Sequence, residues 1–205
     1  SGSSFMYGGD GDDILAGDDG TDVMFGEDGN DTFRLSLGDD LIFGGLGNDT
    51  LSNANGLEVF DTVTIDLAAG TASGITIGMA NEIYDIENYI GGREKDIVTG
   101  STGANVINGG GGDDVLAGNA GDDHLIGSFQ NDQLFGNAGD DRLAGGQGND
   151  KISGGDGIDT VVLDGSFAEY SFSSSGDSLF LTNGAGDVDQ ILTDVEFFEF
   201  DDVTY

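Results

Sequence analysis

Apolar residues recur at a fixed interval of nine along most of this chain. Written from Gly8, the pattern reads Gly-Gly-x-Gly-x-Asp-x-apolar-x and continues in phase to Ser52, giving five units. It resumes at Gly91 and runs through eight further units to Val162. The eighth position is apolar throughout: Leu15, Met24, Phe33, Ile42, Leu51, Val98, Ile107, Leu116, Leu125, Leu134, Leu143, Ile152 and Val161. Because alternate residues of a strand point to opposite faces, this row predicts one inward-facing side chain per unit.

Glycine recurs at the first and fourth positions of the units. This predicts sharp turns there, with positive φ or with a close approach to a neighbouring chain. We therefore expect the first six residues of each unit to form a turn and the last three to form a short strand. One unit cannot bury its apolar residue alone, so the units must stack into a solenoid in which each leans on its neighbours.

The sixth position carries a carboxylate in every unit but one. The residues are Asp13, Asp22, Asp31, Asp40, Asp49, Asp96, Asn105, Asp114, Asp123, Asp132, Asp141, Asp150 and Asp159. The whole chain has 40 Asp and Glu against 5 Lys and Arg, a formal charge of -35. Self-repulsion of this size opposes a compact state, so we expect a cationic partner. An acidic chain with 39 glycines is typical of disorder, but the nine-residue phase argues against that interpretation.

This nonapeptide resembles the signature of the repeats-in-toxin (RTX) proteins, also called hemolysin-type calcium-binding repeats. The resemblance implies an all-β fold, a parallel β-roll (β-solenoid) with calcium ions in the turns. Two units would make one turn of the roll, so that units two apart stack on the same edge. Asp114 and Asp132 would then be neighbours on one edge, and Asp123 and Asp141 on the other.

Stacked carboxylates make the metal a requirement for folding. Like charges about 5 Å apart cost about 1 kcal/mol in water and about 3 kcal/mol at an effective dielectric constant near 20. Over about nine stacked pairs, this repulsion matches or exceeds the roughly 5 to 15 kcal/mol that stabilises an ordinary domain. Calcium accepts six to eight oxygen ligands in flexible geometry, which suits carboxylates and turn carbonyls. We therefore expect no folded roll without calcium.

The resemblance also implies which residues hold the metal. They are the thirteen sixth-position residues named above, together with the turn glycines Gly9, Gly11, Gly110, Gly112, Gly121, Gly139, Gly146 and Gly148. The family geometry implies a ceiling of about nine Ca²⁺ ions, and we expect about six to eight. Three departures from the pattern put individual sites in doubt: residues 35–37 read Leu-Ser-Leu, and Glu94 and Gln130 replace fourth-position glycines.

The repeats divide the chain into four segments. Residues 1–52 form the first repeat block, 53–90 a β-rich insertion, 91–162 the second block and 163–205 a C-terminal capping segment. In the insertion Val59, Val63, Ile65 and Leu67 alternate with polar residues, which predicts strands. We expect wider β coils that continue the stack, with a ligand pocket as the alternative.

The last segment reads as a β-hairpin. Tyr170 and Phe172 stand on one predicted strand and Leu179 and Leu181 on the other, with a Ser/Gly turn between them. An open solenoid end would expose apolar rungs and strand edges, so a cap is expected here. In the RTX family such tails also lie at or near the signal for type I secretion.

Several classes of function are excluded by what the chain lacks. It has no apolar run of membrane-spanning length and no signal-peptide pattern. Its charge argues against nucleic acids and anionic membranes as partners, because both bind through basic patches. No H-E-x-x-H, G-x-S-x-G or P-loop motif occurs, so we expect no catalytic site in this segment. The single histidine, His124, is at a seventh position and is predicted to point outward.

These observations predict a calcium-binding module of a larger secreted protein. It would fold on meeting extracellular calcium and would support export by type I secretion machinery, and any catalytic domain would lie outside this segment. The alternative is a calcium-dependent adhesin, surface-layer or polysaccharide-binding module at the cell surface, with calcium bridging an acidic polymer to the roll. The third positions form no regular threonine row, which argues against an ice-binding roll.

Overall fold

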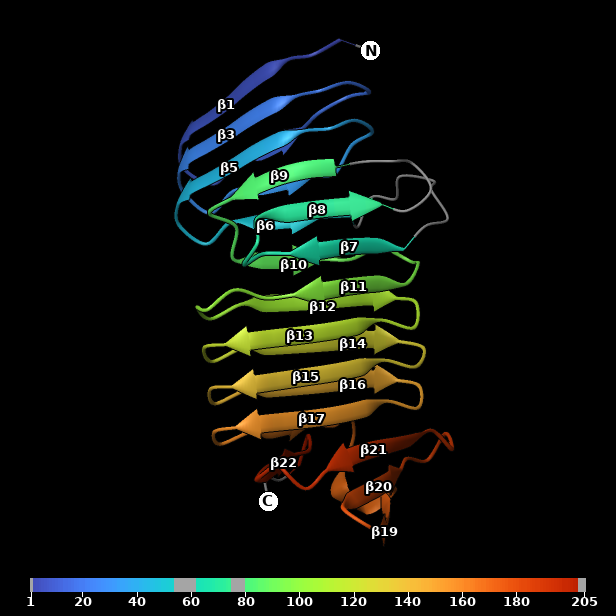
Figure 1. Cartoon of the computed structure of the whole chain (residues 1–205). Helices are drawn as coiled ribbons and strands as arrows, with labels where there is room; N and C mark the ends of the chain where they lie inside the picture. The colour runs from blue at the N-terminus through green and yellow to red at the C-terminus, as the bar shows by residue number, and fades with distance from the viewer. Residues whose placement is uncertain (1, 54–61, 75–79, 203–205) are drawn as a thin grey trace.

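The computed structural model describes residues 2–53, 62–74 and 80–202. They form an elongated β-solenoid whose strands stack like rungs, with the N-terminus at one end and the C-terminal tail at the other (Figure 1). The 3-10 helix η1 (Phe167–Glu169) is the one helical element among the described residues. The predicted all-β class and solenoid architecture are confirmed.

The solenoid consists of two sheets that face one another. The first has thirteen strands, in spatial order β1 (Phe5–Asp10), β3 (Val23–Asp28), β5 (Leu41–Leu46), β9 (Ala80–Tyr84), β8 (Thr71–Gly74), β7 (Val63–Asp66), β11 (Asp96–Thr99), β13 (Val115–Ala120), β15 (Gln133–Ala138), β17 (Lys151–Asp156), β21 (Val188–Leu192), β20 (Ser178–Thr182) and β19 (Ser171–Ser175). The second has nine, in the order β2 (Ile14–Ala16), β4 (Thr32–Arg34), β6 (Thr50–Ser52), β10 (Asn88–Ile90), β12 (Val106–Gly111), β14 (His124–Phe129), β16 (Arg142–Gln147), β18 (Thr160–Val162) and β22 (Phe197–Glu199).

In the repeat blocks the chain crosses from one sheet to the other with every unit. Each strand therefore pairs in parallel with the strand two units later, as Leu116 does with Leu134 and Leu125 with Leu143. The pairing offset is two nonapeptides, so the expected two units per turn are confirmed. This register places identical repeat positions directly above one another along the whole roll.

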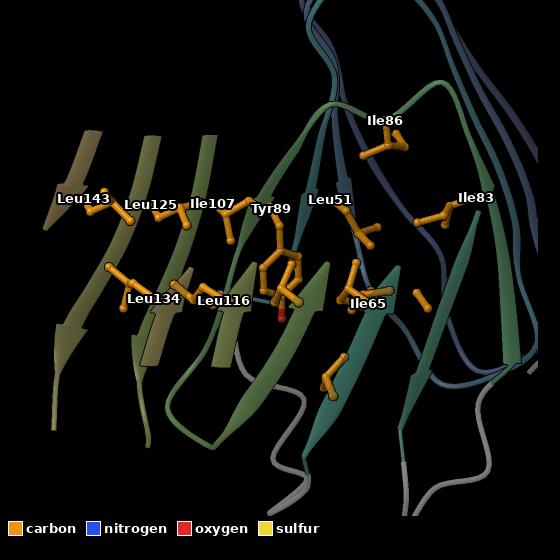
Figure 2. Close-up of a cluster of buried hydrophobic side chains, with 14 of the residues drawn as sticks. Leu51, Ile65, Ile83, Ile86, Tyr89, Ile107, Leu116, Leu125, Leu134 and Leu143 are labelled. Atoms are coloured by element: carbon orange, nitrogen blue, oxygen red, sulfur yellow. The ribbon is translucent and has the colours of Figure 1, made fainter. Parts of the chain in front are cut away.

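The core is the stack of eighth-position residues between the sheets. No eighth-position side chain is more than 5% exposed. Figure 2 shows leucines and isoleucines of the two sheets pointing toward one another, with Tyr89 continuing the row at the insertion. Burial of one such side chain contributes about 1.5 to 3 kcal/mol. Each rung receives this stabilisation only when its neighbours are also folded, which couples the rungs.

Most strands are longer than the sequence pattern predicts. Nine repeats are entered by six-residue strands such as β13, which continues past the expected three residues through the first three positions of the next unit. The ladder skips the first-position glycine, since Ala117 pairs with Phe135 and the next pair is Asn119 with Asn137. The prediction of a six-residue turn was wrong there, because the chain bends at a glycine while its flanking residues keep their sheet partners.

The outer face of the first block carries a row of stacked aromatic rings. Ring centroids are 5.1 Å apart for Tyr7 and Phe25, 4.9 Å for Phe25 and Phe43, and 5.1 Å for Phe43 and Tyr84. These residues follow the inward-facing position by one, so they stand on the outside of β1, β3, β5 and β9. Aromatic pairs of this kind contribute about 0.5 to 1.5 kcal/mol beyond their buried area. The row therefore holds four rungs together without using the turns.

The insertion continues the stack, as predicted, and it widens only the first sheet. In the second sheet β10 alone lies between β6 and β12. In the first sheet β9 pairs in parallel with β5, β7 pairs in parallel with β11, and β8 runs antiparallel between them. Figure 1 shows the first block inclined relative to the second, as expected when one face gains more strands than the other. Val63 and Ile65 are buried, whereas Val59 lies outside the described residues.

The C-terminal tail closes both sheets. The expected hairpin is present as β19 and β20, with Phe172 opposite Leu181, and β21 joins β20 to β17. In the second sheet β22 pairs with β18. Arg142 forms a bidentate pair with Glu199, and the ring of Phe200 lies 5.3 Å from that of Tyr170. The last repeat rungs are therefore covered, which confirms a β cap.

We predict that deletion of residues 163–205 weakens or abolishes calcium-induced folding although every sixth-position repeat residue remains. The deletion exposes the edges of β17 and β18 and removes the preformed surface on which the last rungs pack. A calcium titration followed by far-ultraviolet circular dichroism and hydrodynamic radius compares residues 1–162 with the full chain. Glu199→Gln, which breaks only an exposed ion pair, is the control and should change the midpoint little. Equal midpoints and equal cooperativity for the truncated and full chains would contradict a nucleating cap.

Candidate metal-binding turns

The sixth-position side chains form a hydrogen-bonded ladder along each edge of the roll. Their side chains are at most 3% exposed except that of Asp13, which is partly exposed. The N–H of Asp114 donates to Oδ1 of Asp132 at 2.8 Å, and the N–H of Asp123 donates to Oδ1 of Asp141 at 2.8 Å. The predicted neighbours are thus brought together. One oxygen of most of these carboxylates accepts from a backbone N–H of the rung before it.

The second oxygen of most of these carboxylates is buried and has no hydrogen-bond partner. The unpartnered atoms are Oδ2 of Asp31, Asp49, Asp114, Asp123, Asp132, Asp141, Asp150 and Asp159, and Oδ1 of Asp96. A buried anionic oxygen without a donor costs free energy, and an entire row of them is not tolerated in a stable native state unless something compensates. A cation held at this row would provide that compensation.

Backbone carbonyl oxygens converge on the same spaces. A Cβ added at Gly127 would collide with Oδ2 of Asp132 and with the carbonyl oxygen of Gly145, and one added at Gly136 would collide with Oδ2 of Asp141. Close approach therefore requires glycine at these first positions. No group of three or more His, Cys, Asp and Glu side chains in the described part of the chain is arranged to hold a metal ion. A cation here would depend on carbonyl oxygens beside one or two carboxylates, a hard oxygen set that fits Ca²⁺.

The turn glycines of the predicted site adopt the conformation that glycine favours. All eight have positive φ, from +91° at Gly110 to +143° at Gly148. They occupy the second and fourth positions, and the carbonyl oxygen of one turn points toward the turn two units later, as that of Gly121 does toward Gly139. The sequence predicted positive φ or a close approach at the first and fourth positions, and the first-position glycines show the close approach. It missed positive φ at the second position, which non-glycine residues such as Glu27 and Asn119 also adopt.

Burial raises the pKa of most sixth-position carboxyl groups above the usual value for aspartate. It raises the pKa of Asp123 and of Asp132 to about 7, and that of Asp114 to about 6, with the neighbouring carboxylates adding to the effect for Asp123 and Asp132. Asp22 is the opposite case, because the hydroxyl of Ser4 donates to it and lowers its pKa. The metal-free roll thus holds a row of acids whose charged form is disfavoured near neutral pH.

Not every turn follows this arrangement. The N–H of Asp18 donates to Oδ2 of Asp22 at 3.1 Å, and the hydroxyl of Ser36 donates to Oδ2 of Asp40 at 2.8 Å. Asn105 accepts from the N–H of Ser101 at 2.7 Å, and its amide donates to the carbonyl of Glu87 at 2.7 Å. In these units the sixth-position side chain also accepts a hydrogen bond from a donor within its own turn.

Residues outside the repeats extend the same ladder, and sequence reasoning missed them. The N–H of Ser4 donates to the side chain of Asp22. The side chains of Asn81, Glu87, Asp189 and Glu196 accept from the N–H groups of Asp40, Asp49, Asp150 and Asp159, respectively. Each stands two residues before an apolar residue of the core or its border, namely Met6, Ile83, Tyr89, Ile191 and Phe198. The polar-x-apolar spacing was the available signal, and the lack of a glycine frame concealed it.

A second ladder runs along the exposed fifth positions. The N–H of Asn131 donates to Oδ1 of Asp113 at 3.0 Å, and the N–H of Asn149 donates to Oδ1 of Asn131 at 3.0 Å. Its direction is opposite to that of the buried ladder, since each N–H here reaches back to the preceding turn. Asp or Asn at the fifth position of most units was the sequence signal.

The sequence departures have different structural consequences. Gln130 keeps positive φ, 77°, and its side chain accepts from the N–H of Gly112 at 3.0 Å. Glu94 is not among the residues with positive φ. His124 lies on the outside of β14 next to Arg142 in the ladder, and burial followed by this neighbouring charge lowers its pKa. Among the described residues no helix is long and apolar enough to cross a membrane.

Parallel strand pairing throughout the repeats, a two-unit turn and carboxylate-lined edges define a calcium-binding β-roll. The sequence model of the RTX calcium-binding nonapeptide repeat matches the chain four times, at residues 1–33, 17–51, 90–125 and 126–161, and so covers more than half of it. The chain belongs to this family.

One solved structure of a longer protein aligns with most of this chain. The crystal structure of the extracellular lipase LipA from Serratia marcescens aligns with 25% sequence identity and a TM-score of 0.37. The alignment covers 94% of this chain and 38% of the lipase chain, so this chain spans well under half of that protein. None of the curated proteins matches the chain.

Replacement of one ladder carboxylate tests the repeat register. We predict that Asp123→Ala raises the calcium midpoint of folding and that Asp177→Ala, in the β19–β20 turn, leaves it nearly unchanged. Loss of the acceptor for the N–H of Asn105 alone costs about 1 to 3 kcal/mol. Asp123→Asn keeps an acceptor oxygen and removes the charge, so its effect measures the contribution of charge. Equal shifts for Asp123→Ala and Asp177→Ala in circular-dichroism titrations would show that the register is wrong.

The raised pKa values predict opposite pH responses with and without calcium. A folded-state pKa of about 6 to 7 for Asp114, Asp123 and Asp132 means that the folded roll binds more protons than the unfolded chain. The metal-free roll should therefore gain stability as the pH falls from about 7 toward 4 and lose it as the pH rises through 6 to 7. Protons compete with calcium, so the calcium midpoint should rise as the pH falls from about 7.5 to 5.5. Titrations at several pH values check this, and a constant midpoint would contradict it.

Proposed function

We propose that this chain is a calcium-driven folding module of a larger secreted protein. The observation that carries the proposal is the row of buried, unpartnered carboxylate oxygens, which faces backbone carbonyls in turn after turn. The residues supply oxygen ligands and lack positive charge of their own. A divalent cation would neutralise each site and connect two rungs of the roll.

The module acts as a switch between an extended and a folded chain. Where calcium is scarce, the sixth-position carboxylates repel one another and resist burial, and the solenoid cannot retain them. Where calcium reaches the range of about 10⁻⁴ to 10⁻³ M, typical of extracellular sites, the turns bind it and the rungs stack. Binding free energy thereby becomes folding free energy.

This switch suits export. A chain that stays unfolded inside the cell can thread a type I secretion channel and then fold outside, where calcium drives it forward. Membership of the RTX family supports this proposal, because these proteins are typically secreted. The proposal assigns no catalytic residue to this module, so any enzymatic activity would belong to another part of the protein. A polysaccharide or cell-surface ligand stays a prediction.

We predict that calcium folds the chain and that magnesium does not. Mg²⁺ requires near-octahedral geometry and retains its waters, whereas Ca²⁺ accepts six to eight oxygen ligands, such as carbonyls and carboxylates, in flexible geometry. Parallel titrations with the two ions, followed by far-ultraviolet circular dichroism after exhaustive chelation, make the test. A full β spectrum in excess chelator at neutral pH would overturn the proposed switch, as would equal folding by both ions.

A further inference from the structure

The thirteen repeats form turns of two kinds. In nine of them the second residue has positive φ, and a six-residue strand enters the turn; these second residues are Gly9, Glu27, Gly45, Gly110, Asn119, Ser128, Asn137, Gly146 and Gly155. We call these open turns. In the other four the second residue, Asp18, Ser36, Gly92 or Ser101, is not among the residues with positive φ, and the entering strand has three or four residues. We call these closed turns.

Closed turns aim a donor at the sixth-position side chain. Asp22 and Asn105 accept from the N–H of their own second residues, and Asp40 accepts from the hydroxyl of Ser36. In the remaining closed turn, the hydroxyl of Tyr89 donates to Oδ2 of Asp96 at 3.0 Å, which leaves Oδ1 unpartnered. A hydrogen directed at the oxygen occupies the position that a cation would need.

In open turns the sixth-position carboxylate has an oxygen that no donor faces. Eight of the nine have a buried Oδ2 without a partner, and Asp13, at the solenoid end, is the partly exposed ninth. Positive φ at the second residue accompanies a first-position carbonyl that faces the neighbouring carboxylate, as Gly145 faces Asp132. The space between two stacked open turns is therefore lined by oxygens without an opposing N–H or hydroxyl.

We propose that calcium occupies only the spaces between two stacked open turns, an assignment that rests on the proposed calcium function. Six of the nine stacked repeat pairs qualify: Asp13/Asp31, Asp31/Asp49, Asp114/Asp132, Asp132/Asp150, Asp123/Asp141 and Asp141/Asp159. Three pairs include a closed turn and hold no ion: Asp22/Asp40, Asp96/Asp114 and Asn105/Asp123.

The first block is consequently asymmetric. Both of its calcium sites lie on the edge formed by Asp13, Asp31 and Asp49, whereas the opposite edge is closed by serine hydroxyls. Ser4 donates to Oδ1 of Asp22 at 2.6 Å, and Ser36 lies between Asp22 and Asp40, since a Cβ at Gly17 would meet both Oδ2 of Asp22 and Oγ of Ser36. Here hydroxyl groups replace the metal, and this edge stays assembled without calcium as long as the rungs are folded.

The experiment counts calcium ions in matched variants of the full chain. Native mass spectrometry at saturating calcium gives the number bound, and circular dichroism confirms folding. Asp22→Asn and Asp31→Asn make the same change at buried sixth-position residues of consecutive units, one in a closed turn and one in an open turn. We expect Asp22→Asn to bind as many ions as the unmodified chain and Asp31→Asn to bind at least one fewer. Asp132→Asn should also lose at least one ion.

Two outcomes overturn the assignment, and they are separable from failure of the proposed function. Loss of an ion in Asp22→Asn, or no loss in Asp31→Asn and Asp132→Asn, contradicts it while calcium-driven folding still holds. If Asp22→Asn does not fold, Ser36→Ala removes the hydroxyl between the two closed-turn carboxylates, and an unchanged ion count supports the assignment whereas a lower count rejects it. An unmodified chain that binds no calcium would overturn the proposed function itself.

Discussion

The structure depends on how a folded chain tolerates stacked, buried carboxylates. The two-unit turn places every sixth-position residue above its counterpart, and the parallel register leaves no freedom to separate them. One oxygen of most of these carboxylates accepts from the backbone of the preceding rung, so those acids cannot be removed without losing backbone hydrogen bonds. The other oxygen has no partner in the open turns. The same residue is thus required for stacking and opposes it, and a cation resolves this conflict.

The two ends of the roll are held in different ways. At the N-terminal end, the aromatic row from Tyr7 to Tyr84 and the closed turns connect rungs through apolar contacts and hydroxyl groups. In the second block the turns of six consecutive units, from Asp114 to Asp159, are open, so its stability depends most on the metal. The cap adjoins this block directly through β21 and β22. A preformed surface thus lies beside the rungs that need the most assistance to assemble.

The cap also shows how the solenoid changes from repeats to an ordinary chain. Asp189 and Glu196 accept the last N–H groups of the two ladders, from Asp150 and Asp159. Glu87 and Asn81 do the same at the insertion. The last N–H of each ladder therefore has an acceptor, and the polar-x-apolar spacing persists where the glycines are gone. Polar satisfaction of the backbone is the rule that the repeats and the irregular segments share.

The period of nine determined the solenoid, the inward row and the alignment of the carboxylates, because each follows from a side-chain pattern that repeats without a phase error. It did not determine strand length. The chain bends at a first-position glycine, and whether the residues beyond the bend keep pairing depends on the neighbouring rung. The antiparallel strand β8 was equally hidden, because it lies outside the alternating residues 59–67 and because the direction of a strand depends on the strands with which it pairs. The difference between open and closed turns lies in the φ angle of one residue. Gly9 and Gly92 are the same amino acid at the same position, yet only Gly9 has positive φ. The sequence therefore named the candidate acids, whereas tertiary packing decided which of them face a donor and which are left with an unpartnered oxygen.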